Sequence, residues 1–479
     1  AFQIPAGTPV AHDYTIQAHN SATGRDSNEI TYRVIAPRGY RGYNGWQFAN
    51  FGDPQIPWAC YRDFFGQSAV EYSNGAHRPS AQAWYDASYK GCGGGGNCYG
   101  MSVSSIRSMR REVTTLHSAW FTNNQEDFTW LYPWNTQTKQ TVQEDQGGQL
   151  SAEMAATIND LWNNQDHREA WNTANTLTSN YSQYAILGFW GSGWGHAVVC
   201  YDTEVDGDQR KLLMYDNNVP YRENETGGPD KSISRVNWSA NTYTYPGTSA
   251  YKMVCFSYAD ALQGPSLPAA ATGGAMGTVV AMVNGGNVTQ ITDNEGNTFF
   301  NNDGSINTND ATRIPNSMKF VPLTGTTPTN YPDTFIFSNI NNKNLTFTIG
   351  GSGNKSFRMF QAGDVFETNF SGQGAIRCEK ILSDERSLVL TNPQALSPTQ
   401  LKLIKVLPSE RVYQMDNLGW ISTQGIKLHP TAENLNVESA ANLRFNMEFA
   451  TFVDNAMQSQ SFRNVAVQAV KRGYLAIAP

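Results

Sequence analysis

A cysteine follows a run of four glycines at the point where a helix is predicted to begin. Residues 93–102 read GGGGNCYGMS, so Cys98 lies just before the helical apolar pattern of residues 101–113. Glycine adopts backbone conformations that other residues avoid, and it lets a substrate chain approach closely. The positive end of a helix dipole stabilises a thiolate, which is the nucleophilic form of cysteine. N–H groups at the same helix start can donate to an oxyanion. The segment therefore predicts Cys98 as a nucleophile.

A histidine and an acidic residue can complete a nucleophilic site. His196 follows the glycine- and tryptophan-rich loop 191–195 and opens an apolar strand at 197–201, and Asp216 ends the next apolar strand, 211–215. Two antiparallel strands joined by the polar turn 202–209 would bring this carboxylate beside the imidazole. The carboxylate could then hold the imidazole tautomer that faces the thiol. Asn217 takes that orienting role if the register differs by one. We expect the sulfur, the imidazole and the carboxylate to meet in one solvent-reachable groove.

The elements that must position these groups form two regions. Before residue 264, helices are predicted at 101–113 and at 151–176, the latter with Ser151 as N-cap, and strands at 184–190, 197–201, 211–215 and 251–258. Residues 217–247 are rich in turn formers. Residues 264–275 combine proline, glycine and alanine without periodicity and indicate a linker. After it, short strands separated by turns predict a β-sandwich, or two small ones. The predicted organisation is a catalytic domain at 1–263, the linker, and a β-rich accessory region at 276–479.

The order of these motifs resembles the papain-like cysteine peptidases. The string Asn-Cys-Tyr-Gly-Met-Ser is most similar to secreted bacterial papain-like proteins and to bacteriocin-processing peptidases of the same superfamily. Residues 46–52 and 61–66 also look like the segments that precede the cysteine in those proteins. The resemblance covers about residues 45–260. It implies an α+β papain-like domain in which Cys98 is the nucleophile, His196 the base and Asp216 the orienting residue.

The sequence departs from this family at the oxyanion donor. Papain-like enzymes usually carry a glutamine about six residues before the cysteine, and Cys92 stands there in this chain. Gln47, Asn50 and Gln82 are candidates to replace it, and their spacing does not choose among them. Loss of an oxyanion donor costs about 10²–10³ in rate.

Composition excludes several other classes of protein. Thirty-four basic and 41 acidic residues give a net charge of −7, which argues against nucleic-acid binding. No apolar run is long enough for a transmembrane helix. Low charge with 12% aromatic residues argues against disorder and fits an extracellular protein, and a start at Ala1 indicates processing. Six cysteines are too few for a disulfide scaffold, although a Cys60–Cys92 disulfide is open. Cys200 and Cys255 are either a cross-strand pair or, as we favour, buried thiols.

The sequence thus predicts a secreted bacterial thiol hydrolase that cleaves peptide bonds in a polypeptide substrate and needs no metal or organic cofactor. The β region would serve targeting, substrate contact, self-assembly or contact with a cell surface. One alternative is acyl transfer on the same triad, of the transglutaminase type or on cell-wall amides. Another is a non-catalytic structural or adhesive module, which the missing glutamine favours.

Overall fold

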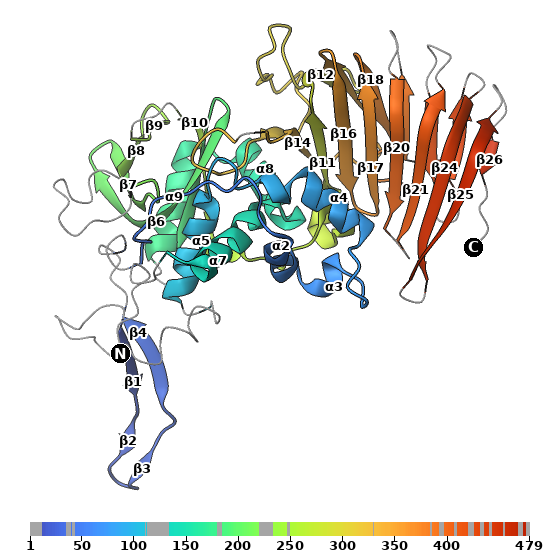
Figure 1. Cartoon of the computed structure of the whole chain (residues 1–479). Helices are drawn as coiled ribbons and strands as arrows, with labels where there is room; N and C mark the ends of the chain where they lie inside the picture. Colours follow the sequence, from blue (N-terminus) through green and yellow to red (C-terminus); the bar gives the residue numbers. More distant parts are fainter. Residues whose placement is uncertain are drawn as a thin grey trace.

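The computed structural model describes most of the chain. The described residues are 12–34, 40, 44–110, 112, 134–179, 184–219, 233–246, 250–328, 330–383, 386–391, 397–406, 410–419, 426–431, 435–439, 443–453, 456–467 and 473–475. They form an N-terminal β-hairpin, a unit of helices and sheet, and a β-rich unit (Figure 1). The fold is therefore mixed α and β and largely β-rich, as predicted.

The hairpin extends away from the rest of the molecule (Figure 1). Its outer strands, β1 (His12–Ile16) and β4 (Ile30–Val34), pair antiparallel, and β2 (His19–Asn20) pairs with β3 (Arg25–Asp26) near the tip. The residues described between 17 and 29 are exposed, so the tip contributes little to a core.

Helices lie on both faces of the first sheet, because the apolar residues of helix 98–109 and those of helix 167–179 join different cores on opposite faces. They are α2 (Trp58–Phe65), α3 (Gln67–Val70), α4 (Pro79–Ala87), the 3₁₀ turn η1 (Tyr89–Gly91), α5 (Cys98–Met109), α7 (Thr136–Gln146), η3 (Gly147–Leu150), α8 (Ala152–Asn164) and α9 (His167–Ser179). Ser151 caps α8 by accepting a hydrogen bond from the N–H of Met154 at 3.1 Å. The single helix expected over 151–176 is two helices, because Gln165 has an extended backbone. The Gln165 side chain instead pairs with both main-chain groups of Cys255.

The first sheet holds the predicted hairpin. Its strand order is β10-β5-β6-β7-β8-β9, all antiparallel. The strands are β5 (Ala185–Gly191), β6 (Trp194–Asp206), β7 (Gln209–Tyr215), β8 (Ile233–Asn237), β9 (Thr242–Thr244) and β10 (Ala250–Ser257), followed by α10 (Tyr258–Ala261). Strands β8 and β9 lie in the stretch that the sequence predicted as turns. Strands β6 and β7 pair antiparallel, so the start of β6 and the residue after β7 lie at the same end of the sheet.

The β unit consists of two facing sheets within the described residues. One has the order β13 (Ser317–Phe320), β14 (Asp333–Ser338), β11 (Thr278–Asn284), β16 (Asn354–Gln361), β17 (Asp364–Ser371), β20 (Ser397–Lys405), β21 (Arg411–Gly419), β24 (Leu443–Val453) and β25 (Ala456–Val467). The other has β12 (Asn287–Asp293), β15 (Leu345–Gly350), β18 (Gly374–Glu379), β19 (Ser387–Thr391), β22 (Ile426–Pro430), β23 (Leu435–Ser439) and β26 (Gly473–Leu475). Alternate side chains of both sheets share one apolar core, so a single sandwich spans the region.

The predicted linker is packed between the two units. It contains the 3₁₀ turns η5 (Pro268–Ala270) and η6 (Gly273–Gly277), and Leu267 and Ala269 are buried. The outer face of β11 and β16 joins the same apolar core as the helices, where the ring of Trp84 meets that of Phe360 edge-on at 4.7 Å. The two units therefore share a core, which fixes the β unit against the helical one.

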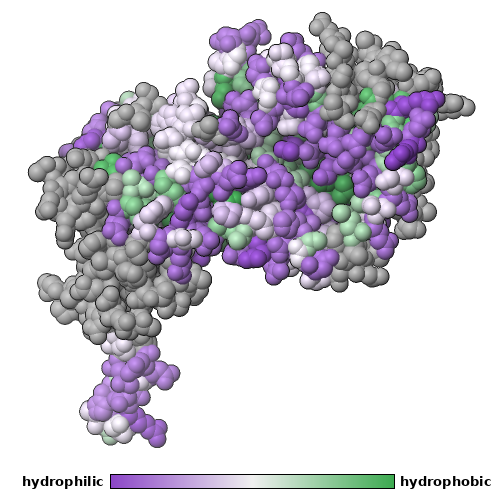
Figure 2. Space-filling view, in the orientation of Figure 1, coloured by the Kyte–Doolittle hydropathy of each residue, from purple (hydrophilic) through white to green (hydrophobic). Residues whose placement is uncertain are grey.

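All six cysteines lie in the described residues, and all are buried and free. The Cys60–Cys92 disulfide that the sequence left open is therefore absent, and Cys200 and Cys255 are buried thiols. Among the described residues no helix has the length and apolarity needed to span a membrane. The face of the molecule seen in Figure 2 is largely hydrophilic, with small hydrophobic patches.

Close packing of α5 on α7 makes a stability prediction. A Cβ at Gly100 would lie 2.0 Å from the carbonyl oxygen of Val142, a backbone atom that cannot turn away. We expect Gly100→Ala to lower the free energy of unfolding by about 1–3 kcal/mol, seen as a lower midpoint in urea denaturation. Gly264→Ala, where a Cβ meets nothing within 4 Å, is the control. Equal midpoints for the two variants would show that α5 can move off α7.

Candidate active site

The N-terminal segment before α2 holds the start of α5 in place. The indole of Trp46 donates to the carbonyl oxygen of Met101 at 3.1 Å, and the side chain of Asn97 donates to that of Phe51 at 2.7 Å. The N–H of Asp53 donates to the carbonyl oxygen of Gly93 at 2.8 Å. These bonds fix the glycine loop and place Cys98 as the first residue of α5.

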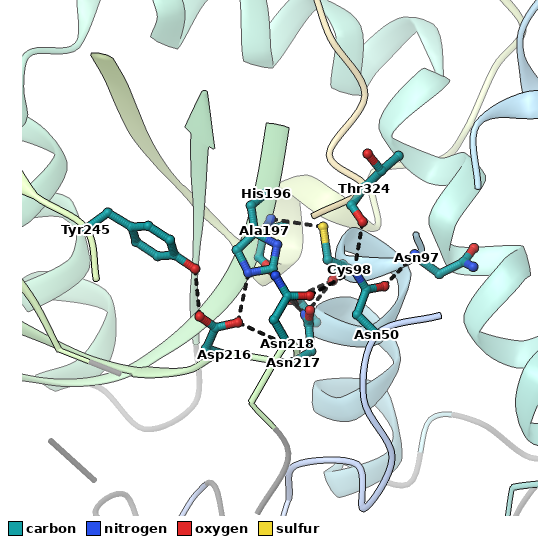
Figure 3. Close-up of polar contacts among 11 residues, drawn as sticks. Asn50, Asn97, Cys98, His196, Ala197, Asp216, Asn217, Asn218, Tyr245 and Thr324 are labelled. Carbon is teal, nitrogen blue, oxygen red and sulfur yellow. Dashed lines mark hydrogen bonds and ion pairs between the residues drawn. The ribbon is translucent and has the colours of Figure 1, made fainter. Parts of the chain in front are cut away.

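The structure brings Cys98, His196 and Asp216 together (Figure 3). The main-chain N–H of Ala197 on β6 donates to Cys98 Sγ at 3.2 Å, so the sulfur lies against the residue that follows the histidine. His196 Nε2 and Asp216 Oδ1 are 2.9 Å apart. The other ring nitrogen, Nδ1, points towards Cys98 (Figure 3). The order sulfur, imidazole, carboxylate is the one that nucleophilic catalysis by a thiol needs.

The Asp216 carboxylate accepts hydrogen bonds from three directions. Besides His196, the hydroxyl of Tyr245 donates to Oδ2 at 2.6 Å, and the N–H of Asn218 donates to Oδ1 at 2.9 Å. Such bonds compensate a carboxylate that is only 5% exposed. With both oxygens held, the carboxylate keeps the imidazole in one orientation.

Charge and burial tune the two ionisable partners in opposite directions. Burial lowers the pKa of His196, but the negative charges of Cys98 and Asp216 outweigh it and raise that pKa to about 10. Burial raises the pKa of Asp216, but the imidazolium and the donors around it outweigh this, so that pKa is lower than usual. Both shifts favour the charged forms, imidazolium on His196 and carboxylate on Asp216.

Of the oxyanion candidates, the structure brings Asn50 to the site. Its Oδ1 accepts from the N–H of Asn97 at 2.7 Å, and its Nδ2 donates to the carbonyl oxygen of Thr324 at 2.7 Å and to Asn218 Oδ1 at 3.0 Å, beside Cys98 (Figure 3). Gln47 is exposed. Gln82 lies on α4, where its side chain pairs with His77 and Asp86. Asn50 is therefore the side chain placed to stabilise an oxyanion.

Asn217 does not orient the imidazole, the role that the sequence left open for it. Its side-chain amide donates to the carbonyl oxygens of Cys98 at 2.9 Å and Ala197 at 3.1 Å, and to the hydroxyl of Ser102 at 3.2 Å. It does not bond the imidazole, which Asp216 holds instead. Asn217 thus ties the start of α5 to β6 and sets the spacing between sulfur and histidine.

The solvent-reachable groove expected from the sequence is closed. Cys98 is 0% and His196 1% exposed. The cover is a segment of the β unit, residues 321–326, which we call the covering segment. Leu323 pairs with Gly195 in a parallel bridge, the N–H of Leu323 donates to the side chain of Gln149 at 2.7 Å, and its carbonyl accepts from Gln146 at 3.0 Å. The sulfur is thus enclosed in the interior, because Leu323 and Thr324 are fully buried and Leu323 belongs to the same apolar core as Cys98.

The glycine loop makes room for this cover. A Cβ at Gly96 would lie 2.0 Å from the carbonyl oxygen of Thr324, and one at Gly95 would lie 2.8 Å from its hydroxyl oxygen. The hydroxyl of Thr326 donates to the carbonyl oxygen of Gly95. The loop therefore accepts a polypeptide backbone at close range, as its glycine content predicted.

Sequence reasoning missed Tyr245 and the covering segment. Tyr245 lies in the turn-rich stretch after β9, and nothing in its neighbours marks it as a partner of Asp216. The covering segment reads Val-Pro-Leu-Thr-Gly-Thr, and its proline and glycine signal only a turn. Both contacts arise from the fold.

Comparisons with protein-family models, with curated proteins and with solved structures found no match to this chain. No relative is therefore at hand to supply a function. The contacts described above carry the inference instead.

The Tyr245 hydroxyl offers a test of the carboxylate's environment. We expect Tyr245→Phe to slow peptide cleavage about tenfold, because a buried carboxylate loses a charge-assisted hydrogen bond. That bond helps to lower the pKa of Asp216, so its loss should move the acid limb of kcat/KM to higher pH. Tyr243→Phe is the matched control, since the nearby Tyr243 hydroxyl bonds no described residue. An unmoved acid limb would reduce Tyr245 to a packing role.

Proposed function

We propose that this chain is a thiol hydrolase that cleaves peptide bonds through Cys98, His196 and Asp216, on a papain-like arrangement of helix and sheet. The observation that carries the proposal is the cluster itself. A cysteine at a helix start faces an imidazole whose far nitrogen is held 2.9 Å from a buried carboxylate. Asn50 beside it supports the proposal, because it offers the oxyanion donor that the sequence did not identify.

The steps follow from the positions of these groups. The sulfur attacks the carbonyl carbon of a peptide, and the developing oxyanion is stabilised by the Asn50 amide and the N–H of Cys98 at the helix start. His196 delivers its proton to the leaving amine, which leaves a thioester on Cys98. Water then hydrolyses the thioester, with His196 accepting the proton.

An external substrate needs the covering segment to move. Gly325 has a φ of +89°, and a Cβ there would lie 2.3 Å from Asn50 Nδ2. The added Cβ would also lie 3.2 Å from His196 Nδ1, so Gly325→Val should push the covering segment out of the site by a clash inside it, without placing a charge in the core.

The test gives this variant a mixed peptide library and follows new α-amino groups by mass spectrometry. We expect cleavage that is lost after treatment with iodoacetamide. Amine-crosslinked products without freed α-amino groups would instead indicate acyl transfer. A Gly325→Val variant that is folded by circular dichroism and alkylated at Cys98, yet cleaves nothing before alkylation, would refute the hydrolase.

A further inference from the structure

The covering segment binds in the site through its main chain. The N–H of Thr324 donates to the carbonyl oxygen of Gly195, directly before His196, at 2.9 Å. Its carbonyl oxygen accepts from Asn50 Nδ2 at 2.7 Å (Figure 3). The same nitrogen also donates to Asn218 Oδ1 at 3.0 Å, and both distances are those of ordinary hydrogen bonds. The donor proposed for the reaction is thus already bonded to one specific carbonyl of this chain.

The next residue lies close to the histidine. A Cβ at Gly325 would lie 3.2 Å from His196 Nδ1. The N–H of Gly325 donates to the carbonyl oxygen of Gly195 at 2.7 Å. The carbonyl of the Thr324–Gly325 peptide bond is thus bonded to the proposed oxyanion donor, and the bond itself lies near the imidazole.

We propose, on the basis of the function above, that Cys98 cleaves the chain's own peptide bond between Thr324 and Gly325. The Cys98 sulfur forms a bond with the carbonyl carbon of Thr324 as the carbon–nitrogen bond to Gly325 breaks. His196 gives its proton to the Gly325 nitrogen, which leaves as an amine. Water then attacks the thioester, which leaves a carboxylate on Thr324 and the thiolate on Cys98; one proton of the water goes to His196 and the other, through solvent, to the new amine. The sum is peptide plus water giving one carboxylate and one ammonium group.

Burial and proximity favour this bond over any external one. Cys98 is fully buried beneath the covering segment, so no other polypeptide reaches it while the segment is in place. A reacting group held in the same molecule can act at an effective concentration of about 10⁵–10⁸ M. Cleavage would give the segment two free ends, which lets it leave and opens the groove to external substrates.

The two products should remain associated. The cut lies between β13 and β14, which pair with each other in register Ser317↔Phe337 to Phe320↔Thr334, and β14 also pairs with β11. These ladders join strands from both sides of the cut. The fragments should therefore co-elute in native gel filtration and separate only on denaturation.

The experiment incubates the purified full chain at neutral pH and follows it by denaturing electrophoresis, intact mass and N-terminal sequencing. We expect a new N-terminus at Gly325, formed at a rate that does not depend on protein concentration. Cys98→Ala should stay intact, and Asn50→Ala should cut about 10²–10³ times more slowly. Cys378→Ala is the matched control, because Cys378 is a buried free thiol on β18 of the β unit.

The Gly325→Val variant separates this proposal from the proposed function. An intact wild-type chain, together with peptide cleavage by Gly325→Val, would overturn self-cleavage and leave the hydrolase standing. An intact chain with no cleavage by the folded variant would overturn both. A cut elsewhere, or one that persists in Cys98→Ala, would also overturn self-cleavage at this bond.

Discussion

Cys98→Ala is expected to abolish peptide cleavage by this chain, both of its own 324–325 bond and of added peptides. Removal of a catalytic nucleophile leaves only the catalysis that binding and an oxyanion hole supply, which corresponds to a loss on the order of 10⁶-fold. The measurement is kcat/KM for a library-derived peptide in the Gly325→Val background, with and without Cys98. The second readout is the mass of the wild-type and Cys98→Ala chains after incubation.

Cys98→Ala must be compared with a thiol that the site does not use. Cys255 on β10 is also buried and free, so Cys255→Ala makes a similar cavity in the same unit. Both variants should lower the urea midpoint, and only Cys98→Ala should lose activity. Residual cleavage of more than about one part in 10³ in Cys98→Ala would assign the reaction to another nucleophile.

Asp216→Asn is expected to lower kcat/KM by about 10⁴-fold while the protein stays folded. The amide can still contact His196 Nε2, but it no longer favours the imidazolium, and it can hold the ring in the wrong tautomer. The Asp216 carboxylate is one of the charges that raise the pKa of His196 to about 10. Its removal lowers that pKa, so the alkaline limb of the pH profile should move from about pH 10 to lower pH.

Asp206→Asn provides the control for this change. Asp206 is the last residue of β6, the strand that carries His196, and it is exposed and paired with Lys211 at 3.0 Å. Loss of a surface ion pair costs little, so activity and the alkaline limb should match wild type. If Asp216→Asn behaved like Asp206→Asn, the carboxylate would not orient the histidine, and the triad would reduce to a pair.

The β unit supplies the segment that covers Cys98. The sequence suggested an accessory region for targeting or assembly, yet β13 leads directly into the segment that covers Cys98. The Gln146 and Gln149 side chains at the end of α7 and in η3 hold Leu323 of that segment. The unit thus controls access to the catalytic groups, and self-cleavage would release that control once.

Local patterns determined the elements that carry the chemistry. The glycine run before Cys98, the apolar strand after His196 and the strand that ends at Asp216 are each readable from neighbouring residues. Alternating apolar residues likewise indicated many strands of the β unit. Helix starts and strand alternation depend on residues only a few positions apart, so the sequence alone reveals them. The sequence did not predict that the helix ends at Gln165, because the Gln165 side chain pairs with β10, 90 residues away.

Tertiary structure alone decided which groups surround the sulfur. Asn50 was one of several oxyanion candidates until the fold placed its amide against Thr324, 274 residues further along the chain. Tyr245 and the closure of the groove likewise depend on contacts between distant segments. Such a hydrogen bond produces no periodic pattern in the sequence, because its two partners meet only when distant parts of the chain pack against each other. The position of Cys98 at a helix start was therefore local information, and its burial was a property of the folded chain.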